Sequence, residues 1–171
     1  MKDLPAFHAA EVAAALCRGC GLCCNGVLFD LVRLQPGDQV KPLMARGLKI
    51  KKRLFFPQPC QALCGTHCTL YDGRPLRCRE FECIQFQRVA AGTQTAAAAA
   101  LLIAKAQTLV LQVEEKLAGT AGENRRKPLA QRVATALQVM PQGPESAALQ
   151  QAMLELQEVL AFHFRVPATP S

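Results

Sequence analysis

Nine cysteines dominate the chemistry that this sequence of 171 residues could perform. Thiolate sulfur is a preferred ligand of zinc and the usual ligand of iron–sulfur clusters. All of these residues lie before residue 84, and the second half of the chain has none. Their number and grouping predict a metal-binding region in the first half of the chain. The nine are Cys17, Cys20, Cys23, Cys24, Cys60, Cys64, Cys68, Cys78 and Cys83.

The first group, CRGCGLCC, places four thiols in residues 17–24. Two residues between cysteines let one tight turn direct both sulfurs to the same ion, about 2.3 Å away. Gly19 and Gly21 would supply the backbone freedom for that turn, because glycine adopts positive φ without steric cost. A third cysteine at the same interval makes a loop of the kind that holds cubane iron–sulfur clusters. Adjacent side chains of an extended segment point in opposite directions, so Cys23 and Cys24 indicate two metal centres or a bridged one.

Two other uses of these cysteines fit the sequence less well. A disulfide framework needs an oxidising compartment, and Asp3, Pro5 and Glu11 stand where a signal peptide has a basic start and an apolar stretch. A thioredoxin-like pair belongs at the strand-to-helix turn of a βαβ unit, and no such pattern surrounds the cysteines. We therefore expect reduced, metal-binding cysteines in a cytoplasmic protein.

The net charge of +7 raises the question of nucleic acid. Positive charge gathers in residues 46–53, 74–79 and 125–127. A groove for single strands normally adds aromatic platforms, but this chain has one Tyr and no Trp. Solvated surface and counter-charge for an anionic metal site are favoured, and a nucleic-acid partner is disfavoured. The longest uncharged apolar run, residues 96–104, is shorter than the roughly 20 residues of a membrane span, so no membrane is expected.

The second group of cysteines, in residues 60–83, reads CQALCGTHCTLYDGRPLRCREFEC. Together with the first group, the pattern C-x2-C-x2-C-C, then P-C, then C-x-x-Y-x-x-R-P-x-x-C-R-x-F-x-C resembles the YkgJ-type cysteine-cluster family over residues 17–84. Members are described as zinc- or iron-chelating domains, and flagellin lysine methylases share the cluster. The resemblance implies eight metal ligands, which are Cys17, Cys20, Cys23, Cys24, Cys60, Cys68, Cys78 and Cys83.

Two residues of the second group are set apart from these ligands. Cys64 is extra to the family pattern, and eight thiolates divide evenly into two four-ligand centres, whereas nine do not. Cys64 and Cys68 would chelate together if the loop between them were helical, but Gly65 disfavours a helix there. His67 has a metal-ligating side chain, yet eight cysteines leave no need for it. We predict that neither Cys64 nor His67 is a metal ligand.

Charge compensation should come from the arginines near Cys78. Four thiolates around Zn²⁺, or around an oxidised cubane, leave a net charge of about −2, which must be offset when buried. Arg74 and Arg79 are predicted to donate hydrogen bonds to the sulfurs. Tyr71, which also matches the family pattern, is interpreted as a packing residue beside the site rather than a catalyst. Tyr71, Arg74 and Arg79 are thus the expected outer partners of the metal.

The expected fold is mainly α, with a small loop-rich, metal-stabilised cysteine domain that includes a short two-stranded sheet. This domain covers residues 1–84 and includes a helix over 5–16, a strand within 26–34 and a helix that begins after Pro36-Gly37-Asp38 and ends at Gly47. A helical region over residues 85–165 packs on it, and 166–171 form a tail. Three helix patterns fill this region, bounded by Gly119, Pro128, Pro141 and Gly143-Pro144.

These features predict a metal-binding protein that chelates an iron–sulfur cluster or zinc, with a redox or assembly role. The three-cysteine loop with a remote fourth ligand favours iron–sulfur over zinc. One alternative is a cluster-dependent protein-modifying enzyme similar to the lysine methylases, and another is a zinc-stabilised nucleic-acid adaptor. An enzyme is disfavoured, because neither a glycine-rich nucleotide loop nor a Ser/His/Asp constellation is visible. A protein partner and the oligomeric state stay open.

Overall fold

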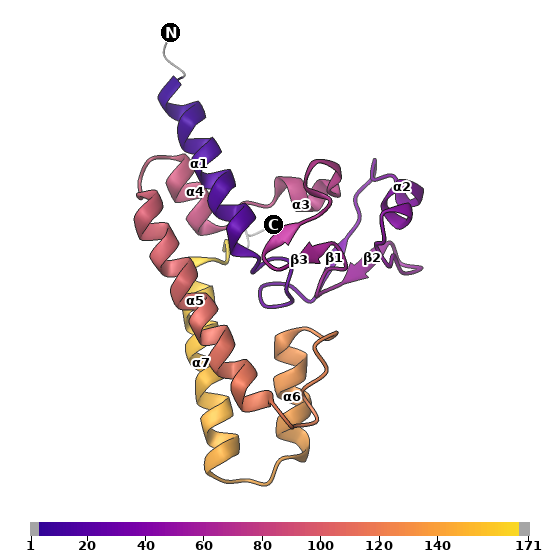
Figure 1. Ribbon diagram of the computed structural model, residues 1–171, viewed down its shortest axis with the longest axis vertical. Helices are drawn as coiled ribbons and strands as arrows, with labels where there is room; N and C mark the ends of the chain where they lie inside the picture. The colour runs from indigo at the N-terminus through magenta and orange to yellow at the C-terminus, as the bar shows by residue number, and fades with distance from the viewer. Residues whose placement is uncertain (1–3, 168–171) are drawn as a thin grey trace.

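The computed structural model describes residues 4–167 of the chain, with side chains from His8 onward. Its described part contains seven α-helices and two two-stranded sheets. The prediction of a mainly α fold with short sheet structure is therefore confirmed. A long antiparallel pair of helices forms one side of the molecule, and the cysteine-bearing segments lie beside one end of it (Figure 1). The predicted tail lies outside the described residues from position 168 on.

The first helix, α1, spans Leu4–Cys20 and therefore contains the first two cysteines of the motif. The prediction that it ends at residue 16 was wrong. Gly19 lies inside the helix, so only Gly21, with a φ of 73°, has the left-handed backbone expected of both glycines. This is the usual way in which a glycine ends a helix. Packing of α1 against α4 and α5 stabilises the additional turn.

The middle of the chain forms two small antiparallel sheets. Strand β1 (Leu31–Arg33) pairs with β2 (Phe55–Pro57), with Val32 opposite Phe56. Helix α2 (Val40–Ala45) lies between them in sequence and ends near Gly47, as predicted. Strands β3 (Leu63–Cys64) and β4 (His67–Cys68) form a tight hairpin, followed by a 3-10 turn and by α3 (Leu76–Glu80). Cys64 and Cys68 are therefore on a hairpin and not on a helix.

Four helices complete the chain. Thr95 caps the longest of them, because its hydroxyl oxygen accepts a hydrogen bond from the Ala98 N–H at 3.2 Å. Helices α5 and α7 run antiparallel, and α6 packs beside their distal ends (Figure 1). The three C-terminal helix patterns are thus present as predicted. The four helices are α4 (Ile84–Ala90), α5 (Ala96–Leu117), α6 (Leu129–Val139) and α7 (Pro144–His163).

The hydrophobic core connects the helices to the cysteine motif. The larger cluster contains fully buried residues of α5 and α7, such as Val113 and Leu156, and also Leu22 and Leu28 from the segment after α1. A smaller cluster around Phe56 lies beneath β1 and β2. Because Leu22 stands between Cys20 and Cys23, burial of this one side chain anchors the motif to the helical core.

A buried ion pair ties α6 to α5. Arg132 of α6 is only 5% exposed, and its guanidinium binds both carboxylate oxygens of Glu114, with one N···O distance of 2.8 Å. Arg132 Nε also donates to the carbonyl oxygen of Gly122 at 2.8 Å. A Cβ atom at Gly122 would collide with Arg132 and Leu117, so a glycine is required at this position.

Helix α5 is the one described helix that is long and apolar enough to cross a membrane. It has 22 residues and a mean hydropathy of 1.6 over its best window, because Lys105 interrupts the apolar run without making it polar on average. One such helix is weak evidence for a span. Its inner face packs in the larger core through Ile103, Ala106, Val113 and Leu117, whereas Ala99 packs with Ala13 and Val89 in a separate small cluster.

Candidate metal centre

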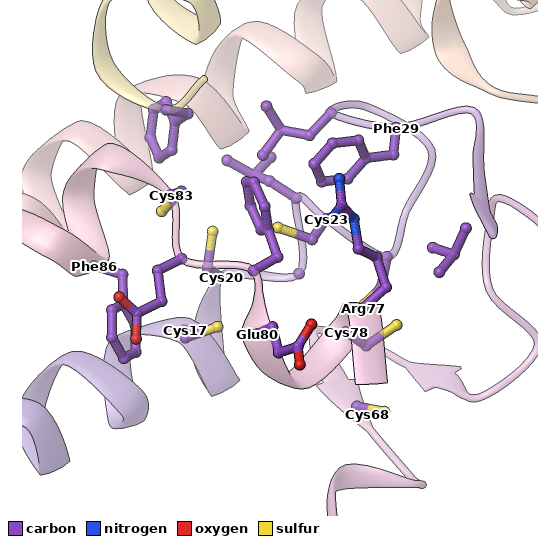
Figure 2. Close-up of a pocket in the computed structure, with 18 of the residues that line it drawn as sticks. Cys17, Cys20, Cys23, Phe29, Cys68, Arg77, Cys78, Glu80, Cys83 and Phe86 are labelled. Carbon is purple, nitrogen blue, oxygen red and sulfur yellow. The ribbon is translucent and has the colours of Figure 1, made fainter. Parts of the chain in front are cut away.

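The cysteines gather around a single open cleft of about 810 Å³. All nine are free thiols. The cleft lies where the end of α1, the following turn, β4, α3 and the start of α4 meet, and several sulfurs face into it (Figure 2). Phe29 and Phe81 also line it, with ring centroids 4.8 Å apart and planes at 89°. The lining includes Cys17, Cys20, Cys23, Cys24, Cys68, Cys78 and Cys83.

Four of the thiols form a first group, which we call group A: Cys17, Cys20, Cys23 and Cys83. Their sulfurs face a common space in Figure 2. Burial, together with the charges of the neighbouring Cys83 and Cys17, raises the pKa of Cys20 to about 12. The pKa of Cys23 is also raised, mainly by burial and then by Cys17 and Cys83. These effects indicate that the four thiols lie within range of one another's charge.

Three separate elements position group A. Cys17 and Cys20 are three residues apart on the last turn of α1 and thus share one helix face. The Gln107 side chain of α5 donates to the Cys20 carbonyl at 3.0 Å and fixes this end of the helix. Cys23 lies in the turn after Gly21. Cys83 is the N-cap residue of α4, where burial raises its pKa but the backbone N–H groups of the first turn lower it.

The second group, group B, consists of Cys24, Cys60, Cys68 and Cys78. Burial raises the pKa of Cys24 to about 12, followed by the charges of Cys60, Cys68 and Cys78. Burial likewise raises the pKa of Cys78 to about 12, followed by the charges of Cys60 and Cys68. The Cys60 N–H donates to the Cys24 carbonyl at 2.7 Å, which joins the two cysteine-bearing segments directly.

The peptide between Cys23 and Cys24 divides the two groups. The segment is a turn rather than the extended chain expected from sequence, because the N–H groups of Cys24 and Asn25 both donate to the Gly21 carbonyl, at 2.9 and 3.0 Å. The two side chains nevertheless belong to different groups. A weaker effect of Cys17 on Cys24 shows that group A and group B adjoin.

The remaining cysteine stands apart. Cys64 is exposed and does not line the cleft, and His67 is exposed as well. Both lie on the hairpin of β3 and β4, whose other face carries Leu63 and Cys68. The structure thus brings seven of the eight cysteines of the family pattern to one cleft, joins the eighth, Cys60, to Cys24 by a backbone hydrogen bond, and leaves Cys64 outside the cleft.

Positive charge lies beside both groups. The Arg74 guanidinium lies 3.8 Å from the centre of the Tyr71 ring, and its Nε donates to the Tyr71 carbonyl at 2.9 Å. The Arg74 charge lowers the pKa of Cys17 and of Cys78, one thiol from each group, although burial outweighs it. Arg74 and Tyr71 thus both line the cleft, and the Arg74 hydrogen bond described here goes to the Tyr71 carbonyl, so the predicted bonds from Arg74 to the sulfurs stay a prediction. Arg79 differs, because it is exposed and is not among the residues that line the cleft.

Two residues at the cleft were not predicted from the sequence. Arg18 also lies over the Tyr71 ring, at 5.1 Å from its centre, and lowers the pKa of Cys17. The only sign of this role in the sequence was the position of Arg18 between Cys17 and Cys20, inside the first C-x-x-C. Gln58 is 1% exposed, lines the cleft, and has a side-chain oxygen without a hydrogen-bond partner. Nothing in the local sequence distinguishes this glutamine from a loop residue.

The donor set fits thiophilic metals, but the thiols stand apart. Four sulfurs around one zinc ion lie about 3.8 Å from each other, as a tetrahedron with bonds of about 2.3 Å requires. Within residues 4–167, no three metal-ligating side chains are arranged closely enough for one ion. The sulfurs of each group would therefore have to close in around a single zinc ion, whereas a cubane cluster accepts ligands that are farther apart.

Comparison of the chain with family models, with curated proteins and with solved structures finds no match. The resemblance to the YkgJ-type family thus rests on the spacing of the cysteines and of their companions. The chemistry of the cleft is accordingly argued from the side chains that line it.

Proposed function

We propose that this protein holds two metal centres, one in group A and one in group B, each with four cysteine thiolates. The observation that carries the proposal is that seven of these eight thiols line one cleft, that the Cys60 N–H donates a hydrogen bond to the Cys24 carbonyl beside it, and that Cys64 lies outside the cleft. Four thiolates complete the coordination of one zinc ion or of one iron–sulfur cluster, so neither group needs a further ligand.

Iron–sulfur clusters are the favoured occupants. Group A combines three cysteines of one short run with a distant fourth, Cys83, and this is the ligand arrangement of many cubane clusters. Zinc is the alternative, and two closed zinc sites of four cysteines each would make the cysteine region a structural module.

The surroundings of the cleft would stabilise bound thiolates. The Arg74 and Arg18 guanidinium groups offset negative charge. Backbone N–H groups also lower the pKa of Cys20, Cys60 and Cys83 against the larger effect of burial. An iron–sulfur cluster would supply one-electron transfer, so a redox or assembly role follows. We place the protein in the cytoplasm, because reduced thiols persist in that compartment.

Metal and sulfide analysis with a visible spectrum, on protein purified without oxygen, tests this function. Two cubane clusters would give about eight iron and eight sulfide per chain with broad visible absorption. Colourless protein with about two zinc ions per chain would support two centres but replace iron–sulfur with zinc. Protein that contains no stoichiometric metal would contradict the proposal.

A further inference from the structure

The outer face of the β3–β4 hairpin carries two metal-ligating side chains opposite each other. Cys64 and His67 are direct partners in the antiparallel register, as are Leu63 and Cys68. Burial alternates along both strands: Leu63 and Cys68 are half-buried, whereas Cys64 and His67 are exposed. Directly opposed residues project from the same face with Cβ atoms about 4.5–5.5 Å apart. Cys64 and His67 therefore face solvent together, on the side away from group B.

This spacing suits a shared ion. A zinc ion binds sulfur at about 2.3 Å and imidazole nitrogen at about 2.0–2.1 Å, which places the two donor atoms about 3.5 Å apart and within reach of two opposed Cβ atoms. The Thr66 hydroxyl oxygen lies 3.3 Å from His67 Nδ1. When Nδ1–H donates to this hydroxyl, the lone pair of Nε2 is free for an ion, and the ring is oriented as ligating histidines usually are.

The fold holds the hairpin in place. Its two-residue turn uses Gly65, with a φ of 60°. Thr66 packs against Gly21 in the turn that follows α1. A Cβ atom added at Gly21 would lie only 3.2 Å from the Thr66 Cα atom. At the hairpin base, the Thr69 N–H and hydroxyl both donate to the Ala62 carbonyl, at 2.8 and 3.0 Å. These contacts thus hold in place the turn that carries Cys64 and His67.

We propose that Cys64 and His67 form a separate, solvent-accessible site for a thiophilic divalent cation such as Zn²⁺. The site has two protein ligands, and water completes the coordination. It is weaker than a four-thiolate centre, because fewer ligands hold the ion, and the ion exchanges with solvent. This site is separate from groups A and B. Its ligands, Cys64 and His67, are not among the metal ligands of the family pattern.

Cobalt binding to the full chain, purified without oxygen and freed of loosely held metal, tests the site. Co²⁺ is the probe, because a bound thiolate gives a charge-transfer band in the near ultraviolet that is recorded as a difference from the starting spectrum. We expect one additional equivalent of Co²⁺ in the wild-type protein. The band should be lost in Cys64→Ser and strongly weakened in His67→Gln. It should be retained in the control His8→Gln, which removes another exposed histidine.

Two results would overturn the proposal: no additional cobalt in the wild-type protein, or a band of full intensity in Cys64→Ser and His67→Gln. The tightly held metal is measured on the same samples before and after the titration and should be equal in all four proteins. A wild-type protein without tightly held metal would refute the two centres of groups A and B. In that case the free thiols of groups A and B would also give a cobalt band, and the difference between the wild-type and Cys64→Ser bands reports on Cys64, so the two failures are distinguishable.

Discussion

Cys23 and Cys24 are adjacent in the chain, yet their thiols belong to different groups of four. After burial, the charges that raise the pKa of Cys23 most are those of Cys17 and Cys83. Those that raise the pKa of Cys24 most are on Cys60, Cys68 and Cys78. A single peptide unit thus joins the two proposed centres, and side-by-side metal sites of this kind are suited to exchange of electrons.

Metal loading should release about four protons per zinc ion. Burial raises the pKa of Cys20, Cys24 and Cys78 to about 12, so these thiols stay protonated from pH 6 to 9. Each coordinated thiol must lose its proton, and protons therefore compete with the metal. Zinc affinity of the metal-free protein should rise with pH across this range. Calorimetry in buffers of different ionisation enthalpy counts the protons, and fewer than two per ion would show that the thiolates are already formed.

Removal of the metal should unfold the cysteine region but not the C-terminal helices. The smaller core contains only six buried side chains, Val32, Leu43, Leu48, Phe56, Ala62 and Leu70, and so small a core needs metal as an additional constraint. We expect chelator treatment to remove amide-exchange protection from residues 21–83 and to lower the circular dichroism signal. Protection in α5 and α7 is the internal control. An unchanged spectrum after complete metal removal would contradict this.

Replacement of Arg74 should weaken metal retention at both centres. The Arg74 charge lowers the pKa of Cys17 and of Cys78. Loss of a side chain that supports the metal ligands without binding the metal typically lowers metal affinity about 10–100-fold. Arg74→Gln should therefore lose metal to a competing chelator sooner than the wild-type protein. Arg79→Gln is the matched control, because Arg79 is exposed and does not line the cleft. Equal retention in both variants would show that Arg74 has no part in holding the metal.

The ion pair between α5 and α6 should contribute to stability without affecting the metal. Glu114→Gln would leave the buried Arg132 guanidinium without its carboxylate partner, and breaking such a pair costs about 3–5 kcal/mol. Glu115→Gln, one residue further along α5 and exposed, should cost little. Urea unfolding of the metal-loaded proteins measures both. Equal stability of the two variants would contradict a structural role for the pair.

The sequence predicted the parts of this structure that depend on local signals. Prolines and glycines bound α5, α6 and α7, and Gly47 follows α2 as expected. The resemblance to the YkgJ-type family implied that Cys64 is not one of the ligands, and in the structure Cys64 is exposed and outside the cleft that seven of the other eight cysteines line. The β3–β4 hairpin explains why Cys64 and Cys68 differ in exposure. Successive side chains of a strand point to opposite faces, so Cys64 points outward and Cys68 points inward.

Features that depend on distant contacts were not predictable. Helix α1 continues through Cys20 because it packs on α4 and α5, and this overrides the turn tendency of Gly19. Cys83 joins group A from the N-terminus of α4, a helix too short to be recognised from periodicity. The pairing of Arg132 with Glu114 crosses 18 residues and follows no local pattern.

Tightly held metal per chain, measured after loosely held metal is removed from three variants prepared side by side, is the most direct test of the two-centre account. Cys83→Ser removes a ligand of group A, Cys78→Ser removes one of group B, and Cys64→Ser changes a cysteine outside both. We expect each of the first two variants to keep about half of the wild-type metal and Cys64→Ser to keep all of it. If Cys64→Ser loses as much metal as the other two, or if neither Cys83→Ser nor Cys78→Ser loses any, the account is wrong.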